Sequence, residues 1–480
     1  MLCVRVPRSY LPERRYACGV LMGECLGLAF ALVPEERTDV LITLPGHAGE
    51  LRLADGLFAT EPDRWLTPDS LPREPLTWWN LAEAAVEAGL APANQAVRPA
   101  RAGPPVRVVA PALPVIYGAP LPSGRFCEVG PGTIRLGVDV LGSAFFMATR
   151  YEEAVLPERD AHGRFPARAS LAARAGFLDR PVVNEYAEVL WWGLNTLWPG
   201  LRRKERKGRF LLSHDVDNPL CTAGRSLAGV GRSAAGDLLR RADPALAVRR
   251  IVSYARTRRT PDADLCNNFD WIMAESEARG ITSAFNFLTV TGPADAAYRL
   301  QDPFIRRLMG EIARRGHEVG LHTSYHSYAD PEQIGREFQD LLAAAEAEGI
   351  HQPAWGGRQH YLRWANPVTW QGWEAAGLQY DSTVGYADQP GFRTGLCHEH
   401  PVFDLESRRT LRLRERPLVV MEVTLFEYLG LPPAAALERI VELRRRCGLF
   451  DGDFTLLWHN CCLIQDWERN LYRTVLDACT

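Results

Sequence analysis

The chain has 480 residues and a formal net charge of −3 at pH 7, and its hydrophobic content of 46% is ordinary for a soluble globular protein. That length predicts two or three structural units, since one unit per roughly 150 residues is a reasonable expectation. The near-neutral charge lacks the basic footprint that broad nucleic-acid binding needs, so nucleic acid is excluded as an expected partner.

The N-terminus predicts a cytoplasmic protein. Charged residues such as Arg5, Arg8 and Glu13 precede any apolar run, which is unlike a secretory signal peptide. The best apolar stretch, Val20 to Val33, is short and contains Glu24, so we expect no transmembrane segment. The 11 cysteines are an odd number without a CxxC pair, which predicts reduced thiols.

The part of the chain before residue 206 predicts two regions. Residues 1–100 mix apolar runs with turn-rich pieces and are expected to form an N-terminal α+β region. Residues 101–205 are expected to form an accessory region, entered through the Pro- and Ala-rich connector Ala91–Pro122. Its predicted elements are a strand and two helices, the second with two core tryptophans: Thr133–Val138, Ser143–Glu153, and Val183–Leu197 with Trp191 and Trp192.

From residue 206 to the C-terminus, short apolar strands alternate with helical stretches. This alternation is typical of a parallel sheet, in an open α/β arrangement or a barrel. An Arg-rich stretch at about 221–262 interrupts it and is expected to be an insertion that acts as a lid or a docking surface. The expected strands are Arg209–Ser213, Thr282–Leu288, Glu318–Leu321, Gln379–Ser382, Leu418–Val423 and Phe454–Trp458, and the helices are Phe269–Arg279, Phe304–Arg315 and Glu332–Glu348.

Two carboxylates follow the first of these strands. Ligands of parallel α/β proteins collect at the carboxyl ends of strands, so polar residues there are candidates for a site. Asp215 and Asp217 project from one side if the backbone is extended. Because close carboxylates repel one another unless a cation or proton lies between them, the pair indicates a metal ligand with a base. The alternative is a turn in which Asp caps backbone groups, and on this motif alone the turn is the more common case.

Two histidines follow the strand Glu318–Leu321. His322 and His326 are four residues apart, so on a helical turn both rings face one ion. With one of the two carboxylates they make a catalytic metal set that leaves positions open for water and substrate. Surface helices also produce such pairs by chance, and the position at a strand end makes chance less attractive.

Three further features are weaker. His459 follows the strand Phe454–Trp458, where a lone histidine is usually a packed or surface residue. Arg358 has the planar fork that orients a carboxylate, although an ordinary ion pair explains it equally well. The run Cys397-His398-Glu399-His400 is interpreted as a loop lining the site, with a second metal site as the alternative.

In this order the motifs resemble the NodB-type polysaccharide deacetylases, carbohydrate esterase family 4, from about Phe210 to the C-terminus. Three family motifs are matched by His214–Asp217 in a spaced Asp-x-Asp form, by His322, Thr323 and His326, and by Leu457-Trp458-His459. The third motif looks like Arg358 to Tyr361, with His360 where proline is usual, and the fourth is matched weakly by Asp381–Thr383 and Gly391–Arg393. Upstream, Gly142–Glu153 and His162–Phe165 look like the N-terminal region that accompanies a bacterial subgroup of these proteins.

The resemblance implies an α/β fold, a distorted, incomplete (β/α) barrel over 206–480, with an additional N-terminal α+β region. It implies one divalent metal ion, zinc first and cobalt or nickel as alternatives, and removal of an N-acetyl group from an amino-sugar glycan or its precursor. Physical reasoning alone allows either aspartate to be the ligand. The roles that the resemblance implies are metal ligands Asp217, His322 and His326, base Asp215, acid His459, positioning residue Arg358, and substrate contacts Tyr361, His360, Asp381, Phe392 and Arg393.

Two other functions stay open at this point. The same barrel chemistry hydrolyses amides of small nitrogen metabolites, and a barrel of this type can also be a non-catalytic glycan-binding module. The presence of every candidate catalytic and metal-ligating residue, Asp215, Asp217, His322, His326 and His459, argues against a module that has lost catalytic activity. The sequence carries no signal for an oligomeric state.

Overall fold

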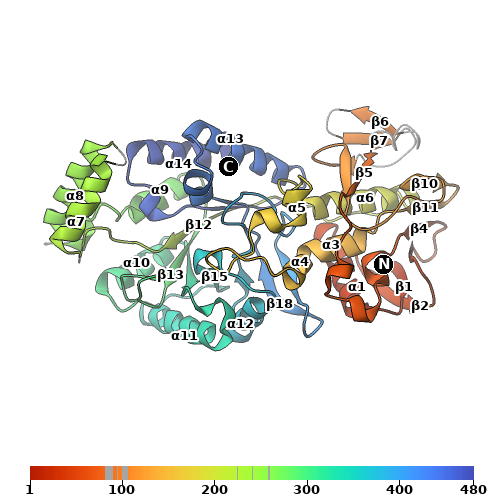
Figure 1. Ribbon diagram of the computed structural model, residues 1–480, viewed down its shortest axis with the longest axis horizontal. Helices are drawn as coiled ribbons and strands as arrows, with labels where there is room; N and C mark the ends of the chain where they lie inside the picture. Colours follow the sequence, from red (N-terminus) through yellow and green to blue (C-terminus); the bar gives the residue numbers. More distant parts are fainter. Residues whose placement is uncertain (82–89, 94–95, 100–105, 224, 240–241, 258–259) are drawn as a thin grey trace.

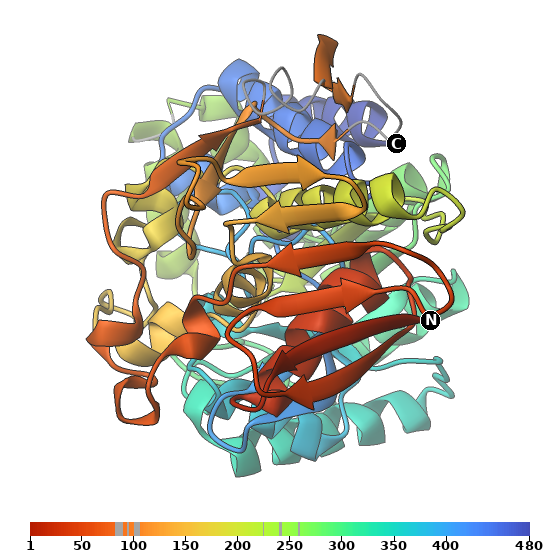
Figure 2. The ribbon, with the colours of Figure 1, turned by 90° about the vertical axis from the view of Figure 1, so that its right-hand side faces the viewer.

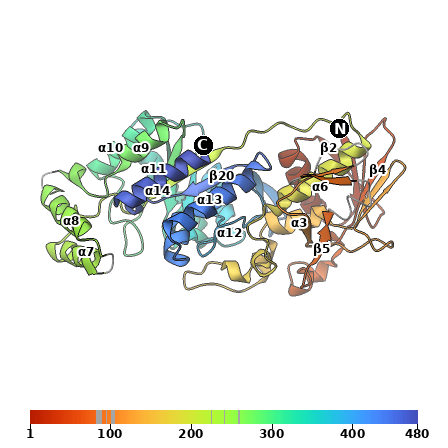
Figure 3. The ribbon, with the colours of Figure 1, turned by 90° about the horizontal axis from the view of Figure 1, so that it is seen from above.

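The computed structural model describes residues 1–480 except 82–89, 94–95, 100–105, 224, 240–241 and 258–259. Two bodies lie side by side, one built on a six-stranded sheet and the other on a nine-stranded sheet (Figure 1). The segment 201–209, which has neither helix nor strand, crosses between them (Figure 3). Among the described residues, no helix has the length and apolar character that crossing a bilayer requires.

The N-terminal sheet is mixed, and its strand order is β10-β11-β4-β3-β1-β2. Helices cover the face of the sheet that is turned toward the second body, as Figure 2 shows. Its strands are β1 Leu2–Pro7, β2 Phe30–Glu35, β3 Val40–Thr43, β4 Glu50–Leu53, β10 Cys127–Gly130 and β11 Thr133–Leu136, and its main helices are α1 Leu11–Cys18, α3 Val140–Ala148 and α6 Val182–Leu197.

One hydrophobic core serves this whole body. Alternate residues of β1 are buried, as expected for a strand with one face on a core, and the same core extends to Trp198. Both predicted regions, 1–100 and 101–205, therefore contribute side chains to it. Trp191 and Trp192 are buried in α6, which confirms the core packing predicted for them.

Shorter pieces lie around that sheet. β5 Thr77–Asn80 pairs with β9 Ala112–Val115, and β6 Leu90–Ala93, β7 Ala96–Pro99 and β8 Val106–Arg107 form a three-stranded sheet. Much of the predicted connector Ala91–Pro122 thus carries strands, and its residues 94–95 and 100–105 lie outside the described residues.

The second body is a mixed α/β unit, as predicted. Its strand order is β17-β18-β16-β15-β14-β13-β12-β20-β19, and every pairing in it is parallel except that of β17 with β18. The order follows that of a (β/α) barrel up to β18, but among the described residues no backbone pairing joins β17 or β18 to β19. The strands are β12 Phe210–Val216, β13 Ser283–Leu288, β14 Glu318–Thr323, β15 Gly356–Gln359, β16 Tyr380–Asp381, β17 His400–Asp404, β18 Arg409–Glu415, β19 Val420–Met421 and β20 Phe454–Leu457. We call the unpaired side between the two edge strands, β17 and β19, the seam. A barrel stays a prediction.

Helices follow most of these strands. They are α9 Phe269–Glu277, α10 Pro303–Arg314, α11 Pro331–Ala347, α12 Val368–Ala376, α13 Pro433–Gly448 and α14 Asp466–Cys479. The expected insertion contains two helices packed on each other, α7 Leu227–Leu239 and α8 Pro244–Thr257, at the far end of the second body (Figure 1). All 11 cysteines are free thiols, as predicted.

One predicted helix is broken. Residues 143–153 form the end of α3 and α4 Tyr151–Val155, because Arg150 between them has left-handed backbone angles with φ of 53°. The break turns the Arg150 side chain into the junction of the two bodies. Its guanidinium is fully buried and contacts Glu152 at 2.7 Å, Glu153 at 2.8 Å and the Arg393 carbonyl. Arg393, from the second body, donates to Glu153 at 2.9 Å.

The junction also has an apolar component and further polar contacts. Leu396, Phe403 and Leu405 of the second body belong to the core of the first. The Tyr16 hydroxyl donates to the Pro401 carbonyl at 2.9 Å, and Arg408 pairs with the buried Glu13 at 2.6 Å. The strand β17 beside the seam therefore packs on the N-terminal body rather than on β19.

We predict that Glu153→Gln destabilises the whole chain. Glu153 neutralises two buried guanidinium groups, and breaking a buried charge pair typically costs about 3–5 kcal/mol because the partner is left uncompensated. Urea denaturation is the measurement. The control is Glu36→Gln, which removes an exposed pair with Arg8 and should cost less than about 1 kcal/mol. Equal effects of the two variants would contradict the role given to Glu153.

Candidate metal centre

A cavity of about 560 Å³ opens at the carboxyl edge of the nine-stranded sheet. Four of the predicted catalytic and metal-ligating residues line it: Asp215, Asp217, His322 and His459. They come from the ends of β12, β14 and β20, so the parallel pairing of these strands brings together residues that are far apart in the chain. His360, which follows β15, lines the same cavity.

Three imidazole rings surround the Asp217 carboxylate. The Nε2 atom of His322 lies 3.3 Å from Asp217 Oδ1, and the Nε2 atoms of His360 and His459 each lie 3.7 Å from Asp217 Oδ2. Ligand atoms of Asp217, His322 and His360 all fall within 4.8 Å of one another, which is close enough for one ion to reach all three. This convergence is the main feature of the site.

Each ring is held through its other nitrogen. The Nδ1 atom of His322 lies 2.8 Å from the Arg358 carbonyl, that of His360 lies 3.0 Å from Asp295, and that of His459 lies 2.6 Å from Glu422. Because these partners are carbonyl or carboxylate oxygens, we assign the Nδ1 protons to the hydrogen bonds. Nε2 of each ring is then the atom directed at Asp217, as in metal sites whose histidines are oriented by outer hydrogen bonds.

The donor set fits a divalent ion. Asp217 Oδ1 is buried and accepts no hydrogen bond from the described residues, although an unsatisfied buried carboxylate oxygen is costly. Two imidazoles and a carboxylate are ligands of zinc and its neighbours. Burial would raise the pKa of Asp217, but the nearby His322 and His360 imidazoles hold that pKa well below its usual value. Asp217 is therefore ionised and ready to bind a cation.

Asp215 has a different set of contacts, although its Oδ2 lies 3.7 Å from the Nε2 atom of His322. Its Oδ1 accepts from Arg358 at 2.9 Å and from Asn286 at 2.8 Å. Burial would raise the pKa of Asp215, but the Arg358 guanidinium and nearby imidazoles keep it below the usual value. Gly320 makes room for this arrangement, since a Cβ there would lie 2.1 Å from the Asn286 side-chain oxygen. The predicted pairing of Arg358 with Asp215 is thus present.

His459 has the opposite tendency. Burial would lower its pKa, but Glu422 and then Asp217 and Asp215 raise the pKa well above the usual value. The ring is therefore a cation at neutral pH before any metal binds. A protonated imidazole beside an ionised Asp215 gives the site one proton donor and one proton acceptor.

The predicted trio of Asp217, His322 and His326 is not the group that the structure assembles. The prediction assumed a helical turn, but β14 continues to Thr323, so His322 lies in the strand and His326 begins the following 3-10 turn. The His326 side chain is exposed and its ring centroid lies 5.0 Å from that of Tyr325. His360, predicted as a substrate contact, takes the third position because it follows the neighbouring strand β15.

Three predicted substrate contacts lie away from the cavity. Asp381 is buried and accepts from the backbone and hydroxyl of Thr383. Phe392 is packed in the core of the second body, and Arg393 is buried at the junction with Glu153. The weak match to the fourth motif therefore marks structural residues in this chain. Tyr361, in contrast, lines the cavity and is 41% exposed.

Several supporting residues have little signal in the sequence. Glu422 is the single polar residue of the predicted strand Leu418–Val423, and Asn286 lies between two phenylalanines in Thr282–Leu288, a pattern that can be searched for. Asp295 lies in a loop between β13 and α10 and has no such pattern. Neither its partner His360 nor its position could be inferred without the fold.

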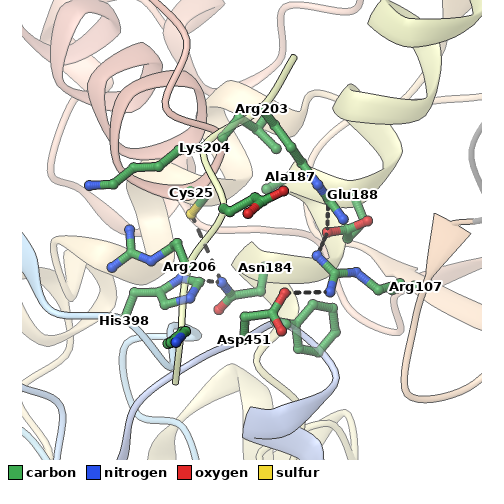
Figure 4. Close-up of a pocket in the computed structure, with 14 residues that line it drawn as sticks. Cys25, Arg107, Asn184, Ala187, Glu188, Arg203, Lys204, Arg206, His398 and Asp451 are labelled. Atoms are coloured by element: carbon green, nitrogen blue, oxygen red, sulfur yellow. Dashed lines mark hydrogen bonds and ion pairs between the residues drawn. The ribbon is translucent and has the colours of Figure 1, made fainter. Parts of the chain in front are cut away.

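A second cavity of about 480 Å³ lies where the connecting segment crosses between the bodies (Figure 4). Its cations are partly neutralised, since Arg107 lies 2.8 Å from both Glu188 and Asp451, and Arg203 lies 2.6 Å from Glu188. His398, from the rival cluster, lines it with Nδ1 2.8 Å from the Asn184 amide nitrogen. Among the described residues, no metal-ligand group includes His398 or His400.

Another group of possible ligands contains Cys221, Asp264 and Cys266. Both carboxylate oxygens of Asp264 already accept hydrogen bonds, from three successive backbone amides that begin at Cys221, from the Thr222 hydroxyl and from the Cys266 amide. Asp264 is therefore committed to holding the loop. This leaves the Asp217 group as the better metal centre.

Residues 2–199 match the model of a family of unknown function, DUF7033. Comparison with curated protein sequences gives no match. Similar solved structures include a protein described as a polysaccharide deacetylase from Mycobacterium smegmatis, with 19% identity over 58% of this chain and 85% of that chain and a TM-score of 0.36. They also include a polysaccharide deacetylase from Bacillus cereus (12% identity, 57% and 87% coverage, TM-score 0.26) and Puue allantoinase (11%, 65% and 91%, TM-score 0.35). Such low similarity does not decide the chemistry of the site.

We predict that the metal-free chain loses stability as the pH rises from about 6.5 to about 9. Burial would lower the pKa of His360, but Asp217 and Asp295 raise it to about 9. A pKa raised in the folded state stabilises the protein below the unfolded pKa of about 6.5 and stops doing so above the folded value. Thermal melting in a chelator at several pH values tests this. His360→Gln should make the melting temperature less dependent on pH than it is in the wild type. The same dependence on pH in both proteins would contradict the prediction.

Proposed function

We propose that this chain is a metal-dependent hydrolase that removes N-acetyl groups from an amino-sugar glycan or glycan precursor. The observation that carries the proposal is the convergence of three imidazole Nε2 atoms on the half-buried Asp217 carboxylate, next to a separate ionised Asp215. The order of motifs along the chain supports the same reaction. A cluster for metal storage alone has no need of a neighbouring base and acid.

Asp217, His322 and His360 are the proposed ligands. A divalent ion, zinc or alternatively cobalt or nickel, supplies a Lewis acid for the acetamide carbonyl and makes hydroxide available near neutral pH. The Nδ1 partners of the two rings keep Nε2 directed at the ion. His459 is the third ring near Asp217, and its short bond to Glu422 favours a proton carrier over a ligand.

The remaining residues move protons. Asp215 accepts a proton from the attacking water while a new C–O bond forms at the acetyl carbon. Arg358 and Asn286 fix the Asp215 carboxylate, so that its free oxygen faces the cavity. His459 then donates a proton to the nitrogen as the C–N bond breaks, which releases acetate and the amine. Glu422 stabilises the charged imidazole before that transfer.

We predict that Asp215→Asn lowers acetate release by about a thousandfold or more, since general bases contribute on that order. The variant keeps the shape of the carboxyl group and loses the proton acceptor. Enzymatic detection of acetate from N-acetylated oligosaccharides is the measurement. Its control is Asp262→Asn on the exposed surface. Release of ammonia or ring opening of small amides, without acetate, would instead favour the small-metabolite hydrolase.

We also predict which histidines hold the metal. His360→Ala should weaken zinc or cobalt binding by about a hundredfold, whereas His326→Ala should leave binding unchanged because its ring is exposed and outside the group. Competition titration with a chelator measures both affinities. The reverse order would restore His326 as the ligand. A chain that binds no divalent ion at all would favour the non-catalytic glycan-binding module.

A further inference from the structure

A segment of the N-terminal body reaches the mouth of the metal-centre cavity. It comprises residues 156–170, between α4 and α5 Leu171–Arg174, and we call it the arm. Figure 1 shows α4 and α5 between the two bodies, and Figure 3 shows the yellow arm extending from the first body along the second. Arg164 of the arm is one of the residues that line the cavity. The region that matches the model of the family of unknown function, residues 2–199, therefore contributes Arg164 to the cavity wall.

The arm is fixed in place by several contacts with the second body. The His162 carbonyl accepts a hydrogen bond from Arg363 Nε at 2.7 Å, and the Nδ1 atom of the His162 ring lies 3.0 Å from the Tyr325 hydroxyl. The Ala167 amide donates to Asp388 at 3.2 Å. These contacts lie on both sides of Arg164 in the sequence. The backbone at Arg164 is therefore anchored, and its guanidinium has a defined position.

Arg164 joins two parts of the cavity rim. Its Nη1 donates to the Tyr361 carbonyl at 3.0 Å and its Nη2 donates to the Tyr428 hydroxyl at 3.0 Å. Asp160 of the arm holds the Nε atom at 2.7 Å, and only 6% of Arg164 is exposed. Tyr361 follows β15 and Tyr428 follows β19, so the guanidinium links two parts of the cavity rim that come from strands that are not neighbours in the sheet.

The Tyr361 backbone needs such a hold. Its φ is 59° and its ψ is 14°, and the next residue, Leu362, also has a positive φ of 55°. Bulky residues rarely adopt this region, and they persist in it only when the surroundings enforce it, often at ligand sites. His360, a proposed metal ligand, begins the same turn. The Arg164 contact to the Tyr361 carbonyl therefore supports the ligand and the strained turn together.

Tyr361 and Tyr428 expose their aromatic rings at the cavity. Tyr361 is 41% exposed and Tyr428 is 45% exposed, and both line the cavity beside His360. The His162 ring lies 5.0 Å from the Tyr361 ring and steadies it from the arm side. Exposed aromatic rings beside polar groups suit a ligand with one apolar face and several hydroxyls, and a sugar ring has that chemistry.

We propose that the arm is part of the substrate site. Arg164 is a positioning residue that holds the His360–Leu362 turn, and Tyr361 with Tyr428 forms a subsite for a sugar ring next to the one that carries the acetamide. The proposal rests on the proposed deacetylase function for its substrate class. It assigns the N-terminal family region a role in choosing oligosaccharides over single sugars.

The experiment compares Arg164→Gln with Arg159→Gln in the full metal-loaded chain. Arg159 is a matched control because it lies in the arm and donates only to carbonyls of the same body. The probes are N-acetylglucosamine and chitotetraose, with acetate release for kcat and KM and calorimetry for binding. Arg164→Gln should raise KM for chitotetraose about tenfold and change KM for the single sugar much less, because only the longer ligand reaches the Tyr361–Tyr428 subsite that Arg164 positions.

A second readout follows the turn itself. Hydrogen exchange of the peptide covering 358–365 should speed up in Arg164→Gln and not in Arg159→Gln. Tyr361→Gly, which accepts a positive φ without strain, should make the further change Arg164→Gln less harmful to cobalt affinity, a coupling that a general loss of structure would not produce.

The outcomes separate the two claims. Unchanged exchange and unchanged cobalt affinity in Arg164→Gln would overturn the positioning role. Wild-type protein that neither binds nor hydrolyses chitotetraose would overturn the sugar subsite. Chitotetraose binding that weakens in Arg164→Gln without any acetate release from wild type supports the subsite and refutes the deacetylase function instead.

Discussion

The site depends on one constraint: three imidazole rings have to point the same nitrogen at one half-buried carboxylate, that of Asp217. A ring can turn freely unless its second nitrogen is held, and here the Arg358 carbonyl, Asp295 and Glu422 each hold one. Asp217 gains its low pKa from this arrangement, and His360 and His459 gain their raised pKa values from it, so the charges on the two sides are interdependent. Removal of one outer partner would therefore change the pKa of Asp217 as well as the orientation of the ring that it contacts.

The sheet provides the positions that this constraint needs. β15, β14, β13, β12 and β20 are consecutive neighbours, and each contributes at or just beyond its end one group of the site or of its support. Parallel pairing sets these ends side by side at one edge, and the small residue Gly320 leaves room for Asn286 behind Asp215. The polar groups lie where the backbone already requires a change from strand to loop.

The sequence predicted six of the second body's strands, β12, β13, β14, β16, β19 and β20, and much of the rim, because apolar runs ending in Asp or His are visible without a structure. It did not predict β15, β17 or β18. Asp215, Asp217, His322 and His459 meet as expected. The choice between His326 and His360 could not be made, because it depends on whether β14 ends at residue 321 or continues to Thr323. The position of Asp295 depends on a loop conformation, and the buried contact of Arg393 depends on Glu153 in the other body, so neither can be inferred from the sequence.

The seam has a consequence for how this protein can be divided. Its strand β17 packs on the N-terminal core, and Leu396, Phe403 and Leu405 belong to that core, so the chain boundary near residue 205 is not a boundary of packing. If the gene were cut there, the N-terminal fragment would expose the apolar core surface that Leu396, Phe403 and Leu405 cover, and the C-terminal fragment would lack Arg164 in its cavity wall. The two halves are thus expected to be inherited together, and chimeras that exchange the N-terminal half between relatives should exchange β17 with it.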